Sequence, residues 1–250
     1  MLWGGDDDSA SVYEALLNNH RMAKGAARVI TYKRRGSSAL RQCASLVSIL
    51  SNDVHPGVAR YLGSSLVSAT ELVVLTEYFS EGSLRQWITS VVKQAQAPEH
   101  FPATPTPSSR PIIRPHTIRE YSRQLVETVA YLHQTLNLTH RSISASSVFL
   151  SDNGTLVKLT DLEDSILIQD SSKTPSLWGD RCDRLGLGSV VVEMVTGIVV
   201  LPQQADLEIP PLDECADEGL FEFVKTLLNA NEGGVFDLLQ KPFLQHESTI

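Results

Sequence analysis

The sequence predicts an α+β protein with two lobes: a small antiparallel β-sheet with one main helix, followed by a larger, mostly helical lobe. Short runs of β-branched and aromatic residues occupy the first third of the chain and enclose one helical window. Beyond a proline-rich segment, apolar residues recur at every third or fourth position, as in helices that bury one face. With 250 residues, the chain is long enough for two lobes that share one core.

The small lobe is expected over about residues 10–79. Residues 27–34 predict a strand, and residues 58–66 and 71–79 predict two further strands around a turn. Residues 37–51 predict the main helix, because their apolar side chains follow a helical spacing. These side chains are Leu40, Cys43, Leu46, Val47 and Leu50.

The large lobe is expected over about residues 80–250. Its long helix is predicted to begin with Thr117 as the N-cap, because Glu120 three residues later completes a capping box. One apolar stripe runs along this helix and identifies its buried face. The stripe consists of Ile118, Tyr121, Leu125, Val129 and Leu132.

A hairpin and further helices are predicted after the long helix. The hairpin joins residues 147–150 to residues 156–161, and Asn153-Gly154 between them is a turn signal. A helix over residues 184–196 is expected to end at a glycine, and the sequences "LFEFVKTLLNA" and "VFDLLQKPFL" predict at least two more helices.

The proline-rich segment is expected to be an inserted loop over about residues 94–116. Six of the twelve prolines lie between Pro98 and Pro115, and proline both restricts φ and removes a backbone donor. A plain insertion between helices is one interpretation of this segment. The other is a docking strip for a partner that recognises polyproline II conformation.

Composition and charge exclude several classes of protein. The net charge of −8 argues against a nucleic-acid-binding role, because phosphate neutralisation needs a basic patch. The three cysteines are widely spaced, which favours a reducing compartment and predicts no disulfide framework. No apolar run approaches the length of a membrane span. We therefore expect a cytoplasmic location, with no membrane partner and no nucleic-acid partner.

The order of the motifs resembles that of the eukaryotic protein kinase domain. The series is "VHPGVARYLG", then "LTEYFSEGSL", then a long helix ending in "YLHQTLNLTHR", and then a hairpin followed by "LTD". This resemblance covers nearly the whole chain, so residues 1–250 are expected to form a single kinase-like domain. It implies a bilobal kinase fold, in agreement with the lobes expected from the apolar pattern.

The catalytic loop of that family reads H-R-D-x-x-x-x-N, in which the Asp receives the substrate proton and the Asn holds magnesium. Here the resemblance places His140 and Arg141 at the first two positions, Ser142 at the Asp position and Ser147 at the Asn position. A serine hydroxyl is a poor base, and it binds magnesium more weakly than a carboxylate does. We therefore expect this degenerate loop to hold no catalytic residue.

The magnesium motif of the family appears here as Asp161-Leu162-Glu163, in which Glu163 replaces a flexible glycine. Asp161 could bind a metal ion, or it could serve only in a turn. Lys33 is the candidate for the nucleotide lysine, and a solvated lysine at a strand end is the alternative. The glutamate that would pair with this lysine aligns near Leu46, in a helix without acidic residues.

The remaining parts of a nucleotide cleft are expected to be vestigial. Thr76 falls at the gatekeeper position, and the hinge comprises Glu77, Tyr78 and Phe79. The segment "SVYEALLNNHRM" replaces the glycine-rich loop, and it reads as helical or irregular. From these departures we expect neither a cofactor nor a metal ion.

The segment "DRCDRLGLGSVVVEMVTG" resembles the central helix of the large lobe, which usually contains D-x-W-S-L-G. Asp180 or Asp183 is expected to bind the backbone of the catalytic loop from the start of this helix, and both candidates stay open. Asp183 aligns with the tryptophan of the pattern, so the chain is expected to have an extra residue before the helix.

Several details resemble one branch of the family, the pseudokinase domain of the general-control non-derepressible kinase. They are "SVYEALLNNHRM", "HPGVARYLG", "ISASSVFLSDNGTLVKLTD" and "GDRCDRLGLGSVVVEMVTG". The resemblance implies a catalytically inactive domain, not an enzyme. This domain would stimulate an adjacent serine/threonine kinase domain that controls translation initiation during amino-acid starvation. Whether it also self-associates stays open. The alternatives are a scaffold in another signalling pathway and a weak, atypical kinase.

Overall fold

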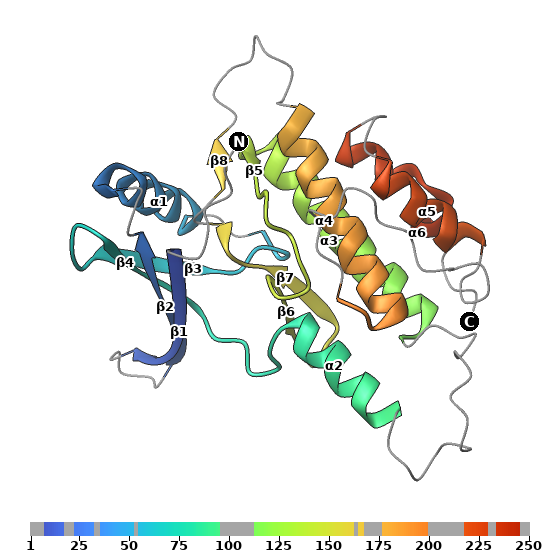
Figure 1. Ribbon diagram of the computed structural model, residues 1–250, viewed down its shortest axis with the longest axis horizontal. Coiled ribbons are helices and arrows are strands. Elements are labelled where there is room, and N and C mark those ends of the chain that lie inside the picture. The colour runs from blue at the N-terminus through green and yellow to red at the C-terminus, as the bar shows by residue number, and fades with distance from the viewer. Residues whose placement is uncertain are drawn as a thin grey trace. The chain divides into compact units, whose positions relative to one another are not determined.

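The computed structural model describes the chain as two compact units (Figure 1). Unit 1 contains residues 1–80 and 160–165, and unit 2 contains residues 81–159 and 166–250. The described residues are 8–17, 23–32, 36–52, 55–95, 113–162, 165–167, 177–199, 218–229 and 234–245. Within this part of the chain, no helix combines the length and the apolar character needed to cross a membrane.

Unit 1 contains a four-stranded antiparallel sheet in the order β1-β2-β4-β3. Its strands are β1 (Asp8–Leu17), β2 (Ala23–Tyr32), β3 (Tyr61–Leu66) and β4 (Glu71–Glu77). The main helix is α1 (Gly36–Leu50), as the apolar spacing predicted. The protein kinase-like fold expected from the sequence is therefore confirmed for the small, antiparallel lobe.

The prediction for the first segment of unit 1 was wrong. The segment that read as helical or irregular contributes to β1, which pairs with β2 from Asp8 opposite Tyr32 to Leu17 opposite Ala23. Pairing with β2 satisfies the backbone donors and acceptors of this segment, and such tertiary context routinely overrides a weak local preference. Residues 18–22 of the same segment lie outside the described part of the chain.

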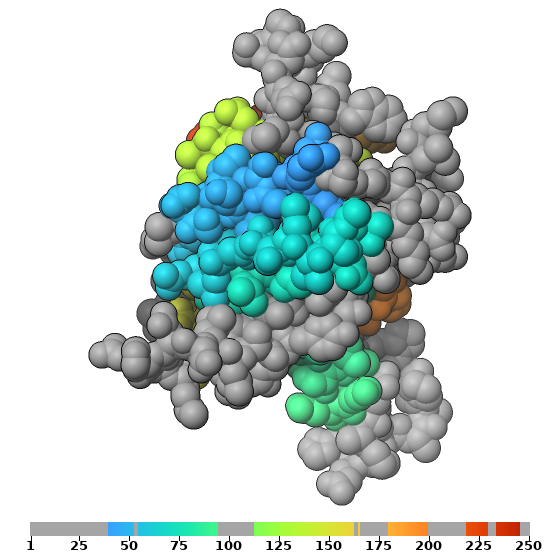
Figure 2. Space-filling model, turned by 90° about the vertical axis from the view of Figure 1, so that its left-hand side faces the viewer, coloured from blue at the N-terminus to red at the C-terminus, as the bar shows by residue number. Residues whose placement is uncertain are grey.

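The core of unit 1 lies between α1 and the sheet. Leu40 and Leu50 of α1 are 0% and 1% exposed, and Leu72 and Val74 of β4 are both 0% exposed. In the space-filling view, α1 in blue lies beside β3 and β4 in cyan and teal (Figure 2). Burial of these apolar side chains is the main stabilising contribution that the sequence pattern predicts for this unit.

Unit 2 is mostly helical, which confirms the second half of the predicted fold. Its longest helices, α3 and α4, pack against each other (Figure 1). The helices are α2 (Leu84–Ala95), α3 (Pro115–Gln134), α4 (Leu177–Thr196), α5 (Glu218–Leu228), α6 (Pro242–Gln245) and the 3-10 helix η4 (Val235–Gln240).

The apolar stripe of α3 is buried as predicted, but the start of the helix differs from the prediction. The helix begins at Pro115, with Arg114 as its N-cap residue, so Thr117 is not the cap. Proline is well suited to the first turn, because it needs no backbone donor there and its φ already fits a helix. Glu120 instead accepts hydrogen bonds from Arg123 at 2.6 Å and from Gln124 at 2.9 Å.

The predicted hairpin of unit 2 is confirmed. It joins β6 (Val148–Ser151) to β7 (Leu156–Leu159) in antiparallel register. Asn153 and Gly154 have φ values of 58° and 76°, which is the left-handed region that their residue types tolerate. A second antiparallel pair, β5 (Leu138–Thr139) with β8 (Ile166–Leu167), was not predicted, because two-residue strands carry no periodic signal.

The predicted end of α4 is also confirmed. Gly197 has a φ of 70°, and its N–H donates to the Glu193 carbonyl at 2.8 Å, so a left-handed glycine ends the helix. The helix begins at Leu177, before the predicted start at residue 184. Residues 235–240 form a 3-10 helix rather than part of a longer α-helix.

Candidate phosphoryl-transfer site

The catalytic loop begins directly after β5, and its backbone is hydrogen-bonded to Asp183 of α4. His140 is fully buried, and its backbone N–H donates to the Asp183 carboxylate at 2.9 Å. The N–H of Arg141 donates to the same carboxylate at 2.5 Å. Arg141 has a φ of 71°, so the loop reaches this position through an unfavourable backbone conformation that the two hydrogen bonds maintain.

These contacts decide between the two aspartates left open by the sequence. Asp183 binds the loop, whereas Asp180 accepts a hydrogen bond from the N–H of Val235 at 3.3 Å. Asp183 therefore takes the Asp position of the D-x-W-S-L-G pattern, and Leu185 takes the tryptophan position. The alignment of Asp183 with the tryptophan was wrong, and so was the extra residue that it required.

Close packing of α4 against the loop depends on a glycine. A Cβ atom at Gly186 would lie 2.7 Å from the Cβ of Ile143 and 2.8 Å from its carbonyl oxygen. Such distances are shorter than real Cβ contacts, so a larger residue would push the loop away from the helix. The absence of a side chain at residue 186 therefore sets how near the loop and α4 can approach.

His133 on α3 adds a second layer under the loop. Its Nε2 lies 2.8 Å from the Asp183 carboxylate, and its Nδ1 lies 3.3 Å from the Asp180 carboxylate. Burial by itself lowers the pKa of His133, but the hydrogen bonds and charges of the two aspartates outweigh it and raise the pKa to about 9. The imidazolium therefore bridges two carboxylates, one of which holds the loop.

Ser142, which stands at the base position, lies beside an imidazole. Its backbone N–H donates to Nδ1 of His140 at 3.3 Å, and its Oγ lies 3.3 Å from the same nitrogen. The Ser142 residue is exposed, whereas the His140 ring is buried. The loop from His140 to Ser147 contains no carboxylate, so its titratable side chains are those of His140 and Arg141.

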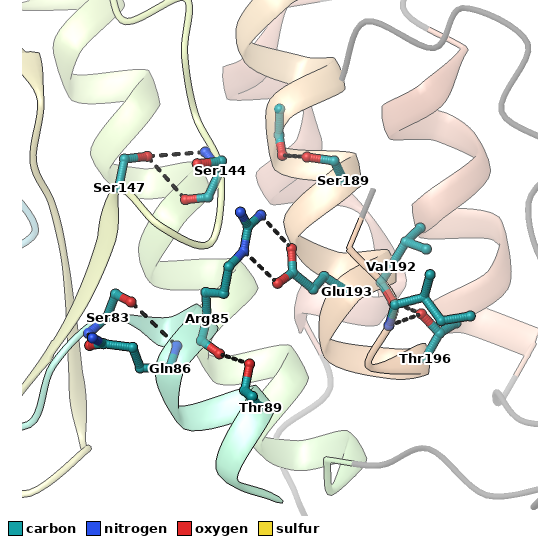
Figure 3. Close-up of polar contacts among 12 residues, drawn as sticks. Ser83, Arg85, Gln86, Thr89, Ser144, Ser147, Ser189, Val192, Glu193 and Thr196 are labelled. Carbon is teal, nitrogen blue, oxygen red and sulfur yellow. Dashed lines mark hydrogen bonds and ion pairs between the residues drawn. The ribbon is translucent and has the colours of Figure 1, made fainter. Parts of the chain in front are cut away.

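Ser147, which stands at the magnesium-binding position, forms hydrogen bonds inside the loop. Its Oγ donates to the Ser144 carbonyl at 3.0 Å and accepts from the Ser144 N–H at 3.0 Å (Figure 3). The side chain is buried, with 2% of the residue exposed. The hydroxyl of Ser147 thus closes a local turn of the loop.

Within the described residues, no group of three or more His, Cys, Asp or Glu side chains could hold a metal ion.

The predicted magnesium aspartate belongs to unit 1. Asp161 has a φ of 65°, and its carboxylate accepts a hydrogen bond from the Thr160 hydroxyl at 2.9 Å. The next residue, Leu162, is fully buried, and its N–H donates to the Tyr61 hydroxyl at 2.8 Å. A turn role and a metal-binding role for Asp161 both fit this geometry. Glu163 lies outside the described residues.

The hinge residues continue from β4 in unit 1. Thr76 is half-buried and pairs with Tyr61 of β3. The Glu77 N–H donates to the Arg60 carbonyl at 2.9 Å, and the Glu77 carboxylate accepts from the Arg60 N–H at 2.7 Å. Phe79 is half-buried. Leu46, at the expected glutamate position, is 5% exposed and belongs to the core. Lys33 lies outside the described part of the chain.

Sequence reasoning did not find the ion pair that links α2 to α4. Arg85 donates from Nε and from its terminal nitrogen to the two carboxylate oxygens of Glu193, both at 2.9 Å (Figure 3). Glu193 is 2% exposed. The N–H of Arg85 also donates to the Ala145 carbonyl at 2.9 Å, so this residue contacts the catalytic loop as well as α4.

A local signal for α2 was present in the sequence. Ser83 and Gln86 form a reciprocal capping pair: the Ser83 N–H donates to the Gln86 side chain at 2.9 Å, and the Gln86 N–H donates to the Ser83 hydroxyl at 3.3 Å. The Ser-x-x-Gln spacing therefore predicts the start of this helix. The partner of Arg85 carries no comparable signal, because Glu193 is 108 positions away.

Comparison with known families identifies the fold as a kinase fold. The family model described as "Protein kinase domain" matches residues 5–222. A solved structure, of Rad53 1-466 in complex with AMP-PNP, superimposes with a TM-score of 0.64 at 18% identity, covering 94% of this chain and 65% of that chain. At this identity the structural likeness supports the fold alone.

Curated relatives carry the names of kinases. The chain is 26% identical to mitogen-activated protein kinase kinase kinase 4 of Homo sapiens over 196 residues, and 24% identical to mitogen-activated protein kinase kinase kinase 1b of Physcomitrium patens over 275 residues. These alignments cover 69% and 97% of this chain. The chain spans only 11% of the human relative and 33% of the moss relative.

These findings contradict the prediction that the domain is not an enzyme. The family that matches is an enzyme family, and the relatives are named as kinases. The predicted resemblance to protein kinases is confirmed at the level of the family. Nothing in these comparisons is specific to the general-control non-derepressible kinase.

Proposed function

This chain belongs to the protein kinase domain family, and from this we propose that it acts inside a larger signalling kinase, where it raises the activity of an adjacent serine/threonine kinase domain. Residues 1–250 would then form one two-lobed domain with an insertion at about residues 94–116. The small share of the kinase relatives that the chain covers supports a larger parent protein, because those relatives extend far beyond the matched segment.

One contrast within unit 2 carries this proposal. The framework of the loop is complete, with Asp183 binding two backbone N–H groups and Arg85 binding Glu193. The hydroxyl at the magnesium position, that of Ser147, is engaged inside the loop. A rigid kinase-like scaffold of this kind presents a fixed surface, and such a surface can favour one of two states of a neighbouring domain.

We further propose that the neighbouring kinase domain phosphorylates the alpha subunit of translation initiation factor 2 during amino-acid starvation. The support is the resemblance of "SVYEALLNNHRM" and "ISASSVFLSDNGTLVKLTD" to the corresponding segments of that branch. The names of the relatives favour a competing pathway, a mitogen-activated protein kinase cascade.

The test adds the purified chain to the active kinase domain of its own parent protein and measures autophosphorylation. We expect an increase of about 5-fold or more, because allosteric couplings usually lie between 5-fold and 150-fold. Two substrates, the factor 2 alpha subunit and a mitogen-activated protein kinase kinase, then distinguish the two pathways. The Asp183→Ala variant, in which the hydrogen bonds that hold the loop are lost, serves as the control with a disrupted framework and is expected to stimulate less. An unchanged rate with the folded chain would refute the proposal.

A second candidate function is phosphoryl transfer by the chain itself. The family match favours it, and Asp161 retains a carboxylate at the magnesium position. The test incubates the chain with radiolabelled ATP, magnesium and a generic protein substrate. Label on the substrate that disappears in the Asp161→Asn variant would support this function, and label that persists in the variant would point to a contaminating kinase.

A further inference from the structure

The contact between Ser142 and His140 assigns donor and acceptor roles. A backbone N–H can only donate, so the Nδ1 of His140 that receives the Ser142 N–H at 3.3 Å carries a lone pair. At that nitrogen, the Ser142 hydroxyl at 3.3 Å is also the donor. The exposed Ser142 thus holds its hydroxyl within hydrogen-bond distance of a buried imidazole nitrogen that can accept the proton, as a nucleophile lies beside its base.

The imidazole is held firmly in this position. His140 is 0% exposed, and its backbone is bound to Asp183, whose carboxylate is itself 0% exposed. The Nε2 of His133 lies 2.8 Å from the same carboxylate. A base held by buried neighbours keeps its orientation toward the hydroxyl, as a proton acceptor in a reactive pair requires.

Positive charge lies close to the start of the loop. Burial is the largest influence on the Cys182 thiol and raises its pKa, and Asp183 acts in the same direction, whereas Arg141 and Arg181 lower it. Both guanidinium groups therefore lie near enough to Cys182, at the start of α4, to influence its charge. Arg141 directly precedes Ser142, so an anionic group on Ser142 would have a cation within reach.

We propose that Ser142 is a phosphorylation site, whose hydroxyl accepts the γ-phosphoryl group of ATP while His140 takes its proton. A bond forms between the Ser142 Oγ and the γ-phosphorus, and the bond from that phosphorus to the bridging β,γ-oxygen breaks. ADP leaves with the electron pair, and the proton passes to His140 Nδ1 and then to solvent. The resulting phosphoserine carries about −1.5 to −2 charges at neutral pH.

The modification would place an anion where the kinase family usually has its catalytic aspartate. This inference goes beyond the regulation of a neighbouring domain and holds whether or not the chain stimulates one. The phosphoryl group can come from ATP bound by this chain, or from ATP used by a separate kinase. In both cases the Ser142 Oγ–phosphorus bond forms and the β,γ-bridging bond of ATP breaks; a separate kinase would supply its own base, so the role of His140 applies to ATP bound by this chain. The experiment distinguishes the two sources.

The experiment incubates the full chain with radiolabelled ATP and magnesium, either alone or with an added active serine/threonine kinase, and maps the label by mass spectrometry. Label on Ser142 without added kinase shows that the phosphoryl group came from ATP bound by this chain. Label that appears only with added kinase shows that the added kinase transferred it. Both results support the proposal. The absence of label on Ser142 in both arms overturns it.

Matched variants then test the pair itself. Ser142→Ala should remove the label at this position, and Ser142→Thr should retain it. Ser146→Ala, at another exposed serine of the same loop, should leave the label on Ser142 unchanged. Because residue 142 is exposed, the first two variants are expected to stay folded, and thermal melting checks this.

The role of His140 is tested with His140→Asn. The Asn side-chain oxygen can still accept the Ser142 N–H, but it cannot take up a proton. We expect labelling of Ser142 to slow by about 100-fold, at the lower end of what a general base contributes. Labelling of a folded His140→Asn chain at the parent rate would overturn the assignment of the base. If this variant does not fold, the Ser142 variants still decide whether the site is phosphorylated.

Discussion

The residues that support the catalytic loop differ from the side chains on the loop itself: the supporting residues form buried ion pairs, whereas the loop carries serine hydroxyls. Beneath the loop, buried charges are paired: Asp183 with His133 and two backbone N–H groups, and Glu193 with Arg85. On the loop, Ser142 is exposed, and the Ser147 hydroxyl forms hydrogen bonds with the Ser144 backbone of the same turn. A buried charge cannot lose its partner without a large cost, whereas an exposed position tolerates exchange.

The largest effect is expected for Asp183→Ala. This change leaves the N–H groups of His140 and Arg141 without their acceptor and removes one carboxylate from His133. We expect a loss of about 3–5 kcal/mol in the free energy of unfolding, measured by urea denaturation. A loss below about 1 kcal/mol would show that the framework does not depend on this carboxylate.

A comparable loss is expected for Arg85→Ala, because it leaves the Glu193 carboxylate buried without its cation. We expect the free energy of unfolding to fall by about 3 kcal/mol, at the low end for a broken buried pair because Arg85 is partly exposed. The double variant Arg85→Ala, Glu193→Met removes both charges and should recover part of the loss. Equal stability of the single and double variants would contradict a charge-based cause.

Stability should also depend on pH through His133. Its pKa rises from 6.5 to about 9 in the folded chain, so the folded state binds the proton more tightly than the unfolded state. The stabilisation is complete below pH 6.5 and is lost as the pH rises through about 9. Within this window, His133 should lower the free energy of unfolding by about 1.4 kcal/mol per pH unit. The decline should be absent from His133→Gln; the same slope in both chains would exclude His133 as its source.

A smaller effect is expected for Gly186→Ala. The added methyl group would meet Ile143 at 2.7 Å, so the loop must shift away from α4. We expect a loss of about 1–3 kcal/mol in a thermal or urea melt. Ser189→Ala, on the same helix and also buried, is a matched control that removes one hydrogen bond to the Gly186 carbonyl without adding volume.

The smallest effect is expected for an exposed ion pair of the same unit. Arg123 and Glu127 lie 2.7 Å apart on α3, with 40% and 44% of their side chains exposed. Glu127→Gln should change the free energy of unfolding by about 0.5 kcal/mol or less, because exposed pairs are screened by water and salt. A loss as large as that of Arg85→Ala would remove the distinction between buried and exposed pairs.

The prediction that the domain is not an enzyme was wrong because it inferred function from a few site positions. It rested on Ser142 and Ser147, whose hydroxyls replace a carboxylate and an amide, and on the missing glycine-rich loop and lysine–glutamate pair. The family match extends over residues 5–222, far beyond these two positions. Exposed site residues change with little effect on the fold, so they indicate chemistry and do not decide family membership.

Local conformational preference was enough to predict part of the molecule from sequence. The Asn153-Gly154 turn, the end of α4 at Gly197 and the apolar stripe of α3 each depend on residues close together in the chain, and all three are confirmed. Only tertiary structure decided that residues 8–17 form a strand, that Asp183 and not Asp180 binds the loop, and that Arg85 meets Glu193. These depend on partners distant in sequence, whose positions a local pattern does not contain.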